Sequence, residues 1–284
     1  MTEYEKWLAY QLEDPSLTEE LKSIQDKPDE INDRFYQDLA FGTAGLRGVL
    51  GAGTNRMNIY TVRKATQGLS NYLNKHKAEG HVPTVAIGYD SRINSTLFSE
   101  ESAAVLAANG IKAYLYPQLM PTPALSFAVR YLHCDAGICV TASHNPAIYN
   151  GIKVFTAGGR DADRTVTDKI EAEIAQINPD TIKSMDYDAA VAAGMITEHN
   201  PTNEYIDSIL SAIDVEAIKN AQLRIALDPM YGVSQTSLSM ILLTCRCDLE
   251  IIHDRHDTLF GGKLPAPNED TLGPLAAVVM DRYR

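Results

Sequence analysis

The sequence lacks an apolar run of the length that a membrane-spanning helix requires, which is about 20 residues. Its acidic first five residues also lack the basic and then apolar order of a signal peptide. These two absences exclude the main sequence signs of membrane insertion and of export. We therefore expect a cytoplasmic protein with no membrane partner.

Cysteine is scarce, and basic side chains are outnumbered by acidic ones. The four cysteines have spacings that fit neither a zinc ribbon nor a small disulfide scaffold, so we expect reduced thiols. The 25 Lys and Arg stand against 37 Asp and Glu, which gives a formal net charge of −12. This balance disfavours binding of nucleic acid by bulk attraction. A phosphorylated ligand would need a local group of cations.

The 284 residues are enough for about two domains, and short apolar runs alternate with segments of helical periodicity. The first group of expected strands spans residues 84–88, 111–115, 136–140 and 151–155, and its helices span 58–76, 99–109, 123–131, 165–177 and 186–193. This alternation predicts an α/β fold with a mixed, mainly parallel sheet sandwiched by helices. A second group follows, with strands at 223–227 and 248–252 and helices at 204–213, 233–243 and 271–283. It predicts a second α/β domain, incomplete because no strand follows its last helix.

Two segments precede this alternation. Residues 1 to about 38 are rich in Glu, Asp, Lys and Leu and predict two or three short amphipathic helices, for example around 3–12 and 17–24. Trp7, the only tryptophan, is expected to anchor them to the body. Residues 42–53 hold five glycines and predict a loop that turns tightly and brings amides to an anion, with an ordinary flexible loop as the alternative.

Ser143 is the first candidate for chemistry, because Thr141-Ala142-Ser143-His144-Asn145-Pro146 follows the expected buried strand at 136–140. Open α/β sheets place ligand sites beyond the ends of their strands. Pro146 fixes its own φ and biases Asn145 away from the helical region, which stiffens the loop. A positioned serine suits phosphoryl transfer. The structural alternative is that Ser and Asn serve here only as turn formers or caps.

Three other segments accompany this loop. They are Phe41-Gly42-Thr43-Ala44-Gly45-Leu46-Arg47-Gly48, Gly88-Tyr89-Asp90-Ser91-Arg92 and Tyr149-Asn150-Gly151-Ile152-Lys153-Val154. In this order and spacing the four segments resemble the α-D-phosphohexomutase superfamily, which includes the phosphoglucomutases and phosphomannomutases. The first segment is most like that of bacterial phosphoglucomutases, some relatives of which act on phosphopentoses.

The resemblance implies the N-terminal part of a four-domain enzyme. Residues 1–40 are expected to be a helical extension of domain I, residues 41–200 domain I with the phosphoserine, and residues 203–284 a partial domain II. Domains III and IV have no counterpart in this sequence. We therefore expect an N-terminal fragment that is inactive alone.

The resemblance also implies an isomerase, an intramolecular phosphotransferase of the phosphoglucomutase type. Such an enzyme interconverts hexose 1-phosphate and hexose 6-phosphate, with glucose the expected sugar, through a phosphoserine at Ser143. Glucose 1,6-bisphosphate would be its intermediate and activator, and small sugar phosphates its partners. A phosphomannomutase, a phosphopentomutase and a non-catalytic sugar-phosphate-binding module remain as alternatives.

The implied site residues come from all four segments. The expected catalytic residues are Ser143, Lys153, His144 and Arg47, and the expected substrate- and phosphate-binding residues are Thr43, Arg47, Arg92 and Asn145. Arg47 can present a planar fork to phosphate oxygens. Lys153 is the expected proton shuttle, with His144 as the alternative. Arg92 either binds phosphate or braces the loop, and Asn145 holds the loop. We expect Arg47, Arg92 and Lys153 to converge in space.

A metal is implied as well. The resemblance implies one Mg²⁺ that binds Ser143 as phosphoserine, with its other ligands in an Asp-rich loop that this chain lacks. The nearest look-alike, Asp161-Ala162-Asp163-Arg164, has too few carboxylates for that loop. We interpret it as a surface turn before the helix at residue 165, whose N-terminus the two carboxylates would stabilise.

A serine hydrolase is a rival hypothesis from another class of enzyme. No Gly-x-Ser-x-Gly elbow surrounds Ser143. The side chains of Ser143 and His144, as neighbours on an extended loop, are also expected to point apart.

Overall fold

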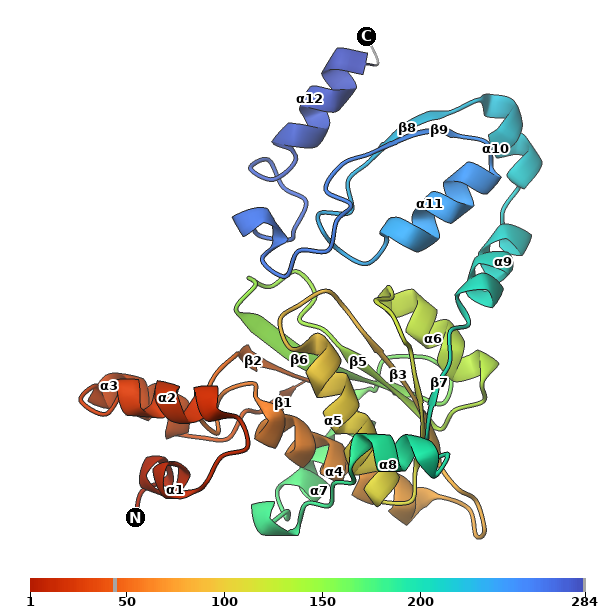
Figure 1. Cartoon of the computed structure of the whole chain (residues 1–284). Helices are drawn as coiled ribbons and strands as arrows, with labels where there is room; N and C mark the ends of the chain where they lie inside the picture. The colour runs from red at the N-terminus through yellow and green to blue at the C-terminus, as the bar shows by residue number, and fades with distance from the viewer. Residues whose placement is uncertain (43–44, 283–284) are drawn as a thin grey trace.

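The computed structural model describes residues 1–42 and 45–282. In this part of the chain the main sheet has seven strands in the order β1-β2-β6-β5-β3-β4-β7 (Figure 1). They are β1 (Phe41–Gly42), β2 (Gly45–Val49), β3 (Thr84–Tyr89), β4 (Lys112–Leu115), β5 (Ala136–Val140), β6 (Tyr149–Thr156) and β7 (Ile196–Glu198). Within this described sheet β1 and β6 run against the other five strands. The predicted mixed, mainly parallel sheet is therefore confirmed.

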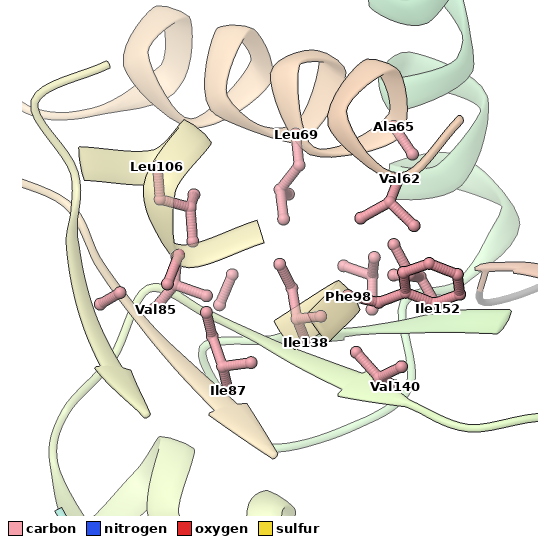
Figure 2. Close-up of a cluster of buried hydrophobic side chains, with 14 of the residues drawn as sticks. Val62, Ala65, Leu69, Val85, Ile87, Phe98, Leu106, Ile138, Val140 and Ile152 are labelled. Carbon is pink, nitrogen blue, oxygen red and sulfur yellow. The ribbon is translucent and has the colours of Figure 1, made fainter. Parts of the chain in front are cut away.

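One face of the sheet is covered by α4 (Ile59–His76), α5 (Ser95–Ala108), α7 (Arg164–Ile174) and α8 (Tyr187–Ala192). Asn58 starts α4 by accepting hydrogen bonds from the amides of Tyr60 and Thr61. The apolar side chains of α4 recur at helical spacing, so they form one stripe on it. Figure 2 shows three of them, Val62, Ala65 and Leu69, over Ile138 of β5 within one buried cluster.

The opposite face is covered by α6 (Thr122–Tyr131). Four buried side chains of α6 pack against strand residues of this face; they are Ala124, Leu125, Ala128 and Val129. Successive strand residues point to opposite faces, so Cys139 joins this cluster while its neighbour Ile138 joins the other one. Helices on both faces confirm the predicted sandwich.

All four cysteines are free and buried, as expected for reduced thiols. Burial raises the pKa of the Cys134 thiol to about 11 and that of Cys139 to about 12. Both side chains therefore remain uncharged thiols at neutral pH, and we assign them to packing.

The N-terminal residues form α1 (Glu3–Ala9), α2 (Pro15–Ser23) and α3 (Pro28–Phe35) beside the sheet (Figure 1). Trp7 meets Phe35 and Tyr60 edge to face, with ring centroids 5.8 and 5.4 Å apart. Because Tyr60 belongs to α4, Trp7 anchors these helices to the body, as the sequence predicts.

A second α/β unit follows the seven-stranded sheet (Figure 1). It consists of α9 (Thr202–Ala212), α10 (Val215–Ala221), β8 (Arg224–Leu227), α11 (Gln235–Thr244), β9 (Asp248–Ile251), the 3-10 turn η2 (Phe260–Gly262) and α12 (Gly273–Arg282). Strands β8 and β9 pair in parallel, and α9 contacts both α6 and α11, so it links the two units. Among the described residues no helix has the length and apolar content needed to cross a bilayer.

Several elements differ from the sequence predictions. The segment expected to be a glycine-rich loop contains β2, because pairing with β6 overrides the weak strand propensity of glycine. Glycine is needed at position 45 because the backbones of β2 and β6 approach closely there: a Cβ on Gly45 would meet the carbonyl oxygen of Ile152 at 1.9 Å. Helix α5 begins at Ser95, four residues before the expected start. The short elements β7 and α10 and the turn η1 (Pro179–Thr181) were not predicted.

Candidate active site

Ser143 lies exposed on the loop between β5 and β6, just beyond the carboxyl end of β5. Its backbone is left-handed, with φ of 58°. A non-glycine residue in this conformation is strained and persists only where its surroundings hold it. Two backbone hydrogen bonds shape the loop, from the Asn145 amide to Ala142 and from the Tyr149 amide to Pro146. The serine hydroxyl is therefore displayed to solvent on an ordered turn.

Asp90 supports this turn through Thr141. The Thr141 hydroxyl donates to Asp90 Oδ2 at 2.6 Å and accepts the Ser143 amide at 3.0 Å. The other oxygen of Asp90 accepts the Arg92 amide at 3.0 Å and the Ser95 hydroxyl at 2.9 Å. Burial raises the pKa of Asp90, and these hydrogen bonds and the charge of Arg92 oppose that rise. Asp90 thus fixes the end of β3, the start of α5 and the serine turn together.

Arg92 holds the same loop by hydrogen bonds to its backbone carbonyls. Its Nη1 donates to the carbonyls of Pro146 and Tyr149 at 2.9 and 3.0 Å. Its Nη2 donates to those of Ser143 and Asn145 at 2.8 and 2.7 Å. The side chain has no exposed surface, and burial lowers the pKa of Arg92 against the opposing charge of Asp90. Of the two roles that the sequence left open, this geometry fits bracing of the loop.

Arg47 reaches the loop from β2. It is exposed, and its Nη1 donates to the side-chain oxygen of Asn145 across 3.4 Å. Its partner across the strands is Gly151, two residues before Lys153 on β6, so Arg47 and Lys153 lie on the same face of the sheet. Cys139 pairs with Lys153 and places this face on the α6 side. The structure thus brings Arg47 and Arg92 to the serine loop. It places Lys153 on the same face of the sheet as Arg47.

Lys153 contacts two side chains near it in the sequence. Its Nζ lies 2.7 Å from Asp161 Oδ2 and 5.6 Å from the centre of the Phe155 ring. Asp163, the other carboxylate of the look-alike segment, caps α7 by accepting the Val166 amide at 3.1 Å. The segment is a turn before a helix, as predicted, but only Asp163 caps that helix, whereas Asp161 pairs with Lys153.

The donor set for Mg²⁺ is incomplete in the described ranges 1–42 and 45–282. Within them no group of three or more His, Cys, Asp or Glu side chains is arranged to hold a metal ion. A hard divalent cation prefers several oxygen ligands, whereas the serine loop offers one hydroxyl. The residues described here therefore do not fit a Mg²⁺ site by themselves.

His144 lies closer to the serine than the sequence analysis expects. Its Nδ1 is 3.3 Å from Ser143 Oγ, so the prediction that the two side chains point apart is wrong. That prediction assumed an extended loop, and the left-handed backbone of Ser143 turns the two side chains to one side.

The remaining expected residue, Thr43, lies outside the described residues. Three residues that received no role from the sequence also belong to the site: Asp90, Thr141 and the buried Asn150, which donates to the Ile93 carbonyl and the Ser95 hydroxyl. All three stand inside the four motif segments, and that placement was the signal that could have found them.

Two family models match the chain. The one described as phosphoglucomutase/phosphomannomutase, alpha/beta/alpha domain I, matches residues 38–180. The one described as alpha/beta/alpha domain II of the same family matches residues 203–282. The first match lies in the seven-stranded unit and the second in the second α/β unit, and α8 and β7 lie between the two matched ranges.

Similar proteins agree with these matches. A phosphoglucomutase of Staphylococcus saprophyticus is 38% identical over 220 residues, which are 75% of this chain and 38% of the relative. One of Staphylococcus haemolyticus is 46% identical over 142 residues, 50% of this chain and 25% of the relative. The chain thus spans well under half the length of these relatives.

Solved structures share the fold. A crystal structure of a Thermus thermophilus protein assigned as a phosphomannomutase superposes with a TM-score of 0.75 at 25% identity, covering 86% of this chain and 52% of that one. Parafusin, a phosphoglucomutase from Paramecium, shares the fold with a TM-score of 0.66 at 21% identity, over 84% of this chain and 46% of its own. The chain belongs to the phosphoglucomutase/phosphomannomutase family.

Proposed function

We propose that this chain carries the phosphoserine part of an enzyme that interconverts glucose 1-phosphate and glucose 6-phosphate. One observation carries the proposal: the exposed Ser143 hydroxyl stands beyond β5 on a loop that the buried Arg92 holds by four carbonyls. A side chain on a braced loop keeps its position during reaction, which phosphoryl transfer requires. The family membership of both α/β units supports the same reaction.

In the proposed step, the bond between phosphorus and Ser143 Oγ breaks as the free hydroxyl oxygen of the sugar monophosphate bonds to that phosphorus. Lys153 accepts the proton of the sugar hydroxyl in its amine form, which requires that it first leave Asp161 and lose its own proton. His144, whose Nδ1 lies 3.3 Å from Ser143 Oγ, returns a proton to the serine oxygen. The bisphosphorylated sugar then returns its other phosphate to Ser143, and the covalent carrier has split one transfer into two.

The remaining site residues act through charge and position. Arg47 binds phosphate oxygens, since its guanidinium is exposed beside the serine loop and can offer two parallel donors. Arg92 and Asn145 keep the loop in place. Thr43 belongs to the proposed phosphate-binding set through the family pattern alone.

Mg²⁺ and glucose 1,6-bisphosphate enter the proposal as the expected metal and activator. When bound, the metal would stabilise negative charge on the transferring group. The described residues do not form its site by themselves. We further propose residues 1–40 as the extension, 41–200 as domain I and 203–284 as part of domain II, in a cytoplasmic enzyme that acts on sugar phosphates and not on nucleic acid.

The test is phosphoryl loading of the chain. Purified protein is incubated with glucose 1,6-bisphosphate and Mg²⁺, and its intact mass is followed with time. We expect the mass of one phosphoryl group to be added to the wild type and not to Ser143→Ala; this single transfer differs from the complete interconversion, for which the fragment is expected to be inactive alone. A wild type that binds glucose 6-phosphate by calorimetry but is never loaded would support a sugar-phosphate-binding module instead.

Two controls address a different sugar and a different reaction. Parallel incubations with mannose 1,6-bisphosphate and ribose 1,5-bisphosphate would show faster loading if the sugar were mannose or a pentose. A serine-directed fluorophosphonate probe tests the serine hydrolase hypothesis. This test is needed because Ser143 Oγ and His144 Nδ1 lie 3.3 Å apart. We expect no labelling of Ser143 by that probe.

A further inference from the structure

The two α/β units meet at Ser91, the residue between Asp90 and Arg92. Ser91 is buried, and its hydroxyl donates to the Tyr231 carbonyl at 3.1 Å. Its own carbonyl accepts from His256 Nε2 at 3.1 Å, so that ring nitrogen carries the hydrogen. Both partners belong to loops of the second unit. The segment that braces the serine loop is therefore itself held by the second unit.

A third contact reaches Arg92 directly. The Arg92 carbon Cζ lies 5.0 Å from the centre of the Phe260 ring, and both side chains are buried. The N–H donors of a guanidinium lie in its plane, and Arg92 uses them on four carbonyls of the serine loop. Its faces have no donors, so an aromatic ring can cover one of them and exclude water.

The Phe260 ring is held by its own turn. Asp257 accepts the amides of Leu259 and Gly261 at 2.9 and 3.1 Å, and Phe260 has a left-handed backbone with φ of 54°. Gly261 packs so closely on Tyr231 that a Cβ there would meet the Tyr231 ring at 2.7 Å. A strained backbone persists where its surroundings fix it. The turn at 257–261 thus presents the ring at a fixed place.

We propose that Phe260 is a positioning residue for the reaction at Ser143 and acts through Arg92. The ring shields the guanidinium from water, so the four hydrogen bonds to the serine loop keep their full strength. Without the ring, water competes for those donors and the loop at 141–149 loosens. The consequence for the reaction rests on the proposed function, whereas the effect on the loop does not.

The first test is hydrogen exchange on the whole unphosphorylated chain. We expect Phe260→Leu to speed exchange of the Asn145 and Tyr149 amides on the order of tenfold, the size of a buried cation–π contact. Phe260→Tyr keeps the ring and should leave both amides near wild type. The Ile252 amide, which donates to the carbonyl of Leu227 at the end of β8, reports whether the second unit stays folded. If the second unit unfolds in Phe260→Leu, Phe260→Met replaces that variant, because methionine fills more of the volume of the phenylalanine side chain.

Ser91→Ala is the matched control for contact between the units. It removes the bond to Tyr231 and leaves Phe260 over Arg92, so we expect the serine loop to exchange as in wild type. An unchanged loop in Phe260→Leu and Phe260→Met would overturn the proposal. So would a loop that Ser91→Ala loosens as much as Phe260→Leu does.

Phosphoryl loading separates this inference from the proposed function. If the wild type is never loaded, the proposed function fails while the exchange result stands. If the wild type is loaded, we expect Phe260→Leu to lower the loading rate on the order of tenfold and Phe260→Tyr to restore it. Equal loading rates in the wild type and Phe260→Leu would end the role of Phe260 in the reaction.

Discussion

The hydroxyl of Thr141 donates to Asp90 across 2.6 Å, and the same oxygen accepts the amide of Ser143. One oxygen atom therefore ties a largely buried acid to the turn that displays the candidate nucleophile. A carboxylate can only accept hydrogen bonds and an amide can only donate, so a hydroxyl is the group that satisfies both at once.

This tie leads to a first prediction, for Thr141→Val. Valine has nearly the same shape but removes the hydroxyl that donates to Asp90 Oδ2 and leaves the Ser143 amide without an acceptor. We expect the free energy of unfolding to fall by about 1–3 kcal/mol, the usual cost of an unsatisfied buried polar group. Urea denaturation measures the change. Thr141→Ser, which keeps the hydroxyl, should recover most of the loss, and a valine variant as stable as the wild type would contradict the prediction.

The second prediction concerns pH and Asp90. Burial raises the pKa of Asp90 in the folded chain above its ordinary value of 3.8. The folded state then binds the proton more tightly than the unfolded state, so Asp90 lowers stability as pH rises above about 4. Asp90→Asn removes this titration. We expect the unfolding free energy of the wild type, minus that of Asp90→Asn, to fall as pH rises from about 4 toward the folded pKa. A difference that stays constant or grows over this range would be inconsistent with a raised pKa.

The predictable part of the fold was its periodic part. Helix α4 was expected at 58–76 and spans Ile59–His76, because Val62, Ala65 and Leu69 repeat at helical spacing and Asn58 caps the start. Strand β2 was not expected, because it contains Gly45 and Gly48, and glycine has a low strand propensity. What makes β2 a strand is its pairing with β6, about 100 residues away in the sequence, and no local pattern shows that pairing.

The candidate site, too, could be predicted from the sequence only in part. Residue type and motif singled out Ser143, Arg47 and Lys153. The sequence left Arg92 open between binding phosphate and bracing the loop, because it does not show whether a guanidinium faces solvent or carbonyls. The contact of Arg92 with Phe260 joins two distant segments and could not be read from either one.

A third prediction concerns Glu20 on α2. Its two carboxylate oxygens accept Arg34 Nη1 at 2.5 Å and the Ala52 amide at 2.8 Å, so it ties the N-terminal helices to the turn after β2. We expect Glu20→Gln to lower the free energy of unfolding by about 1–3 kcal/mol, because a partly buried ion pair loses one charge. Glu19→Gln, at the exposed neighbouring position, is the matched control and should change stability by less than about 0.5 kcal/mol. Equal changes in the two variants would show that the contacts of Glu20 contribute nothing to the free energy of unfolding.

The last prediction separates the strain at Ser143 from its chemistry. The left-handed backbone at φ of 58° costs an L-residue about 1–2 kcal/mol, and glycine avoids that cost. Ser143→Ala and Ser143→Gly both lack the hydroxyl, so neither can be phosphorylated and their comparison isolates the backbone. Glycine also gives the unfolded chain more freedom, which offsets part of the gain. We therefore expect Ser143→Gly to be more stable than Ser143→Ala by about 0.5–1 kcal/mol in urea denaturation. The reverse order would mean that the serine loop does not hold this residue in the left-handed region in solution, and the braced display of the hydroxyl would lose its support.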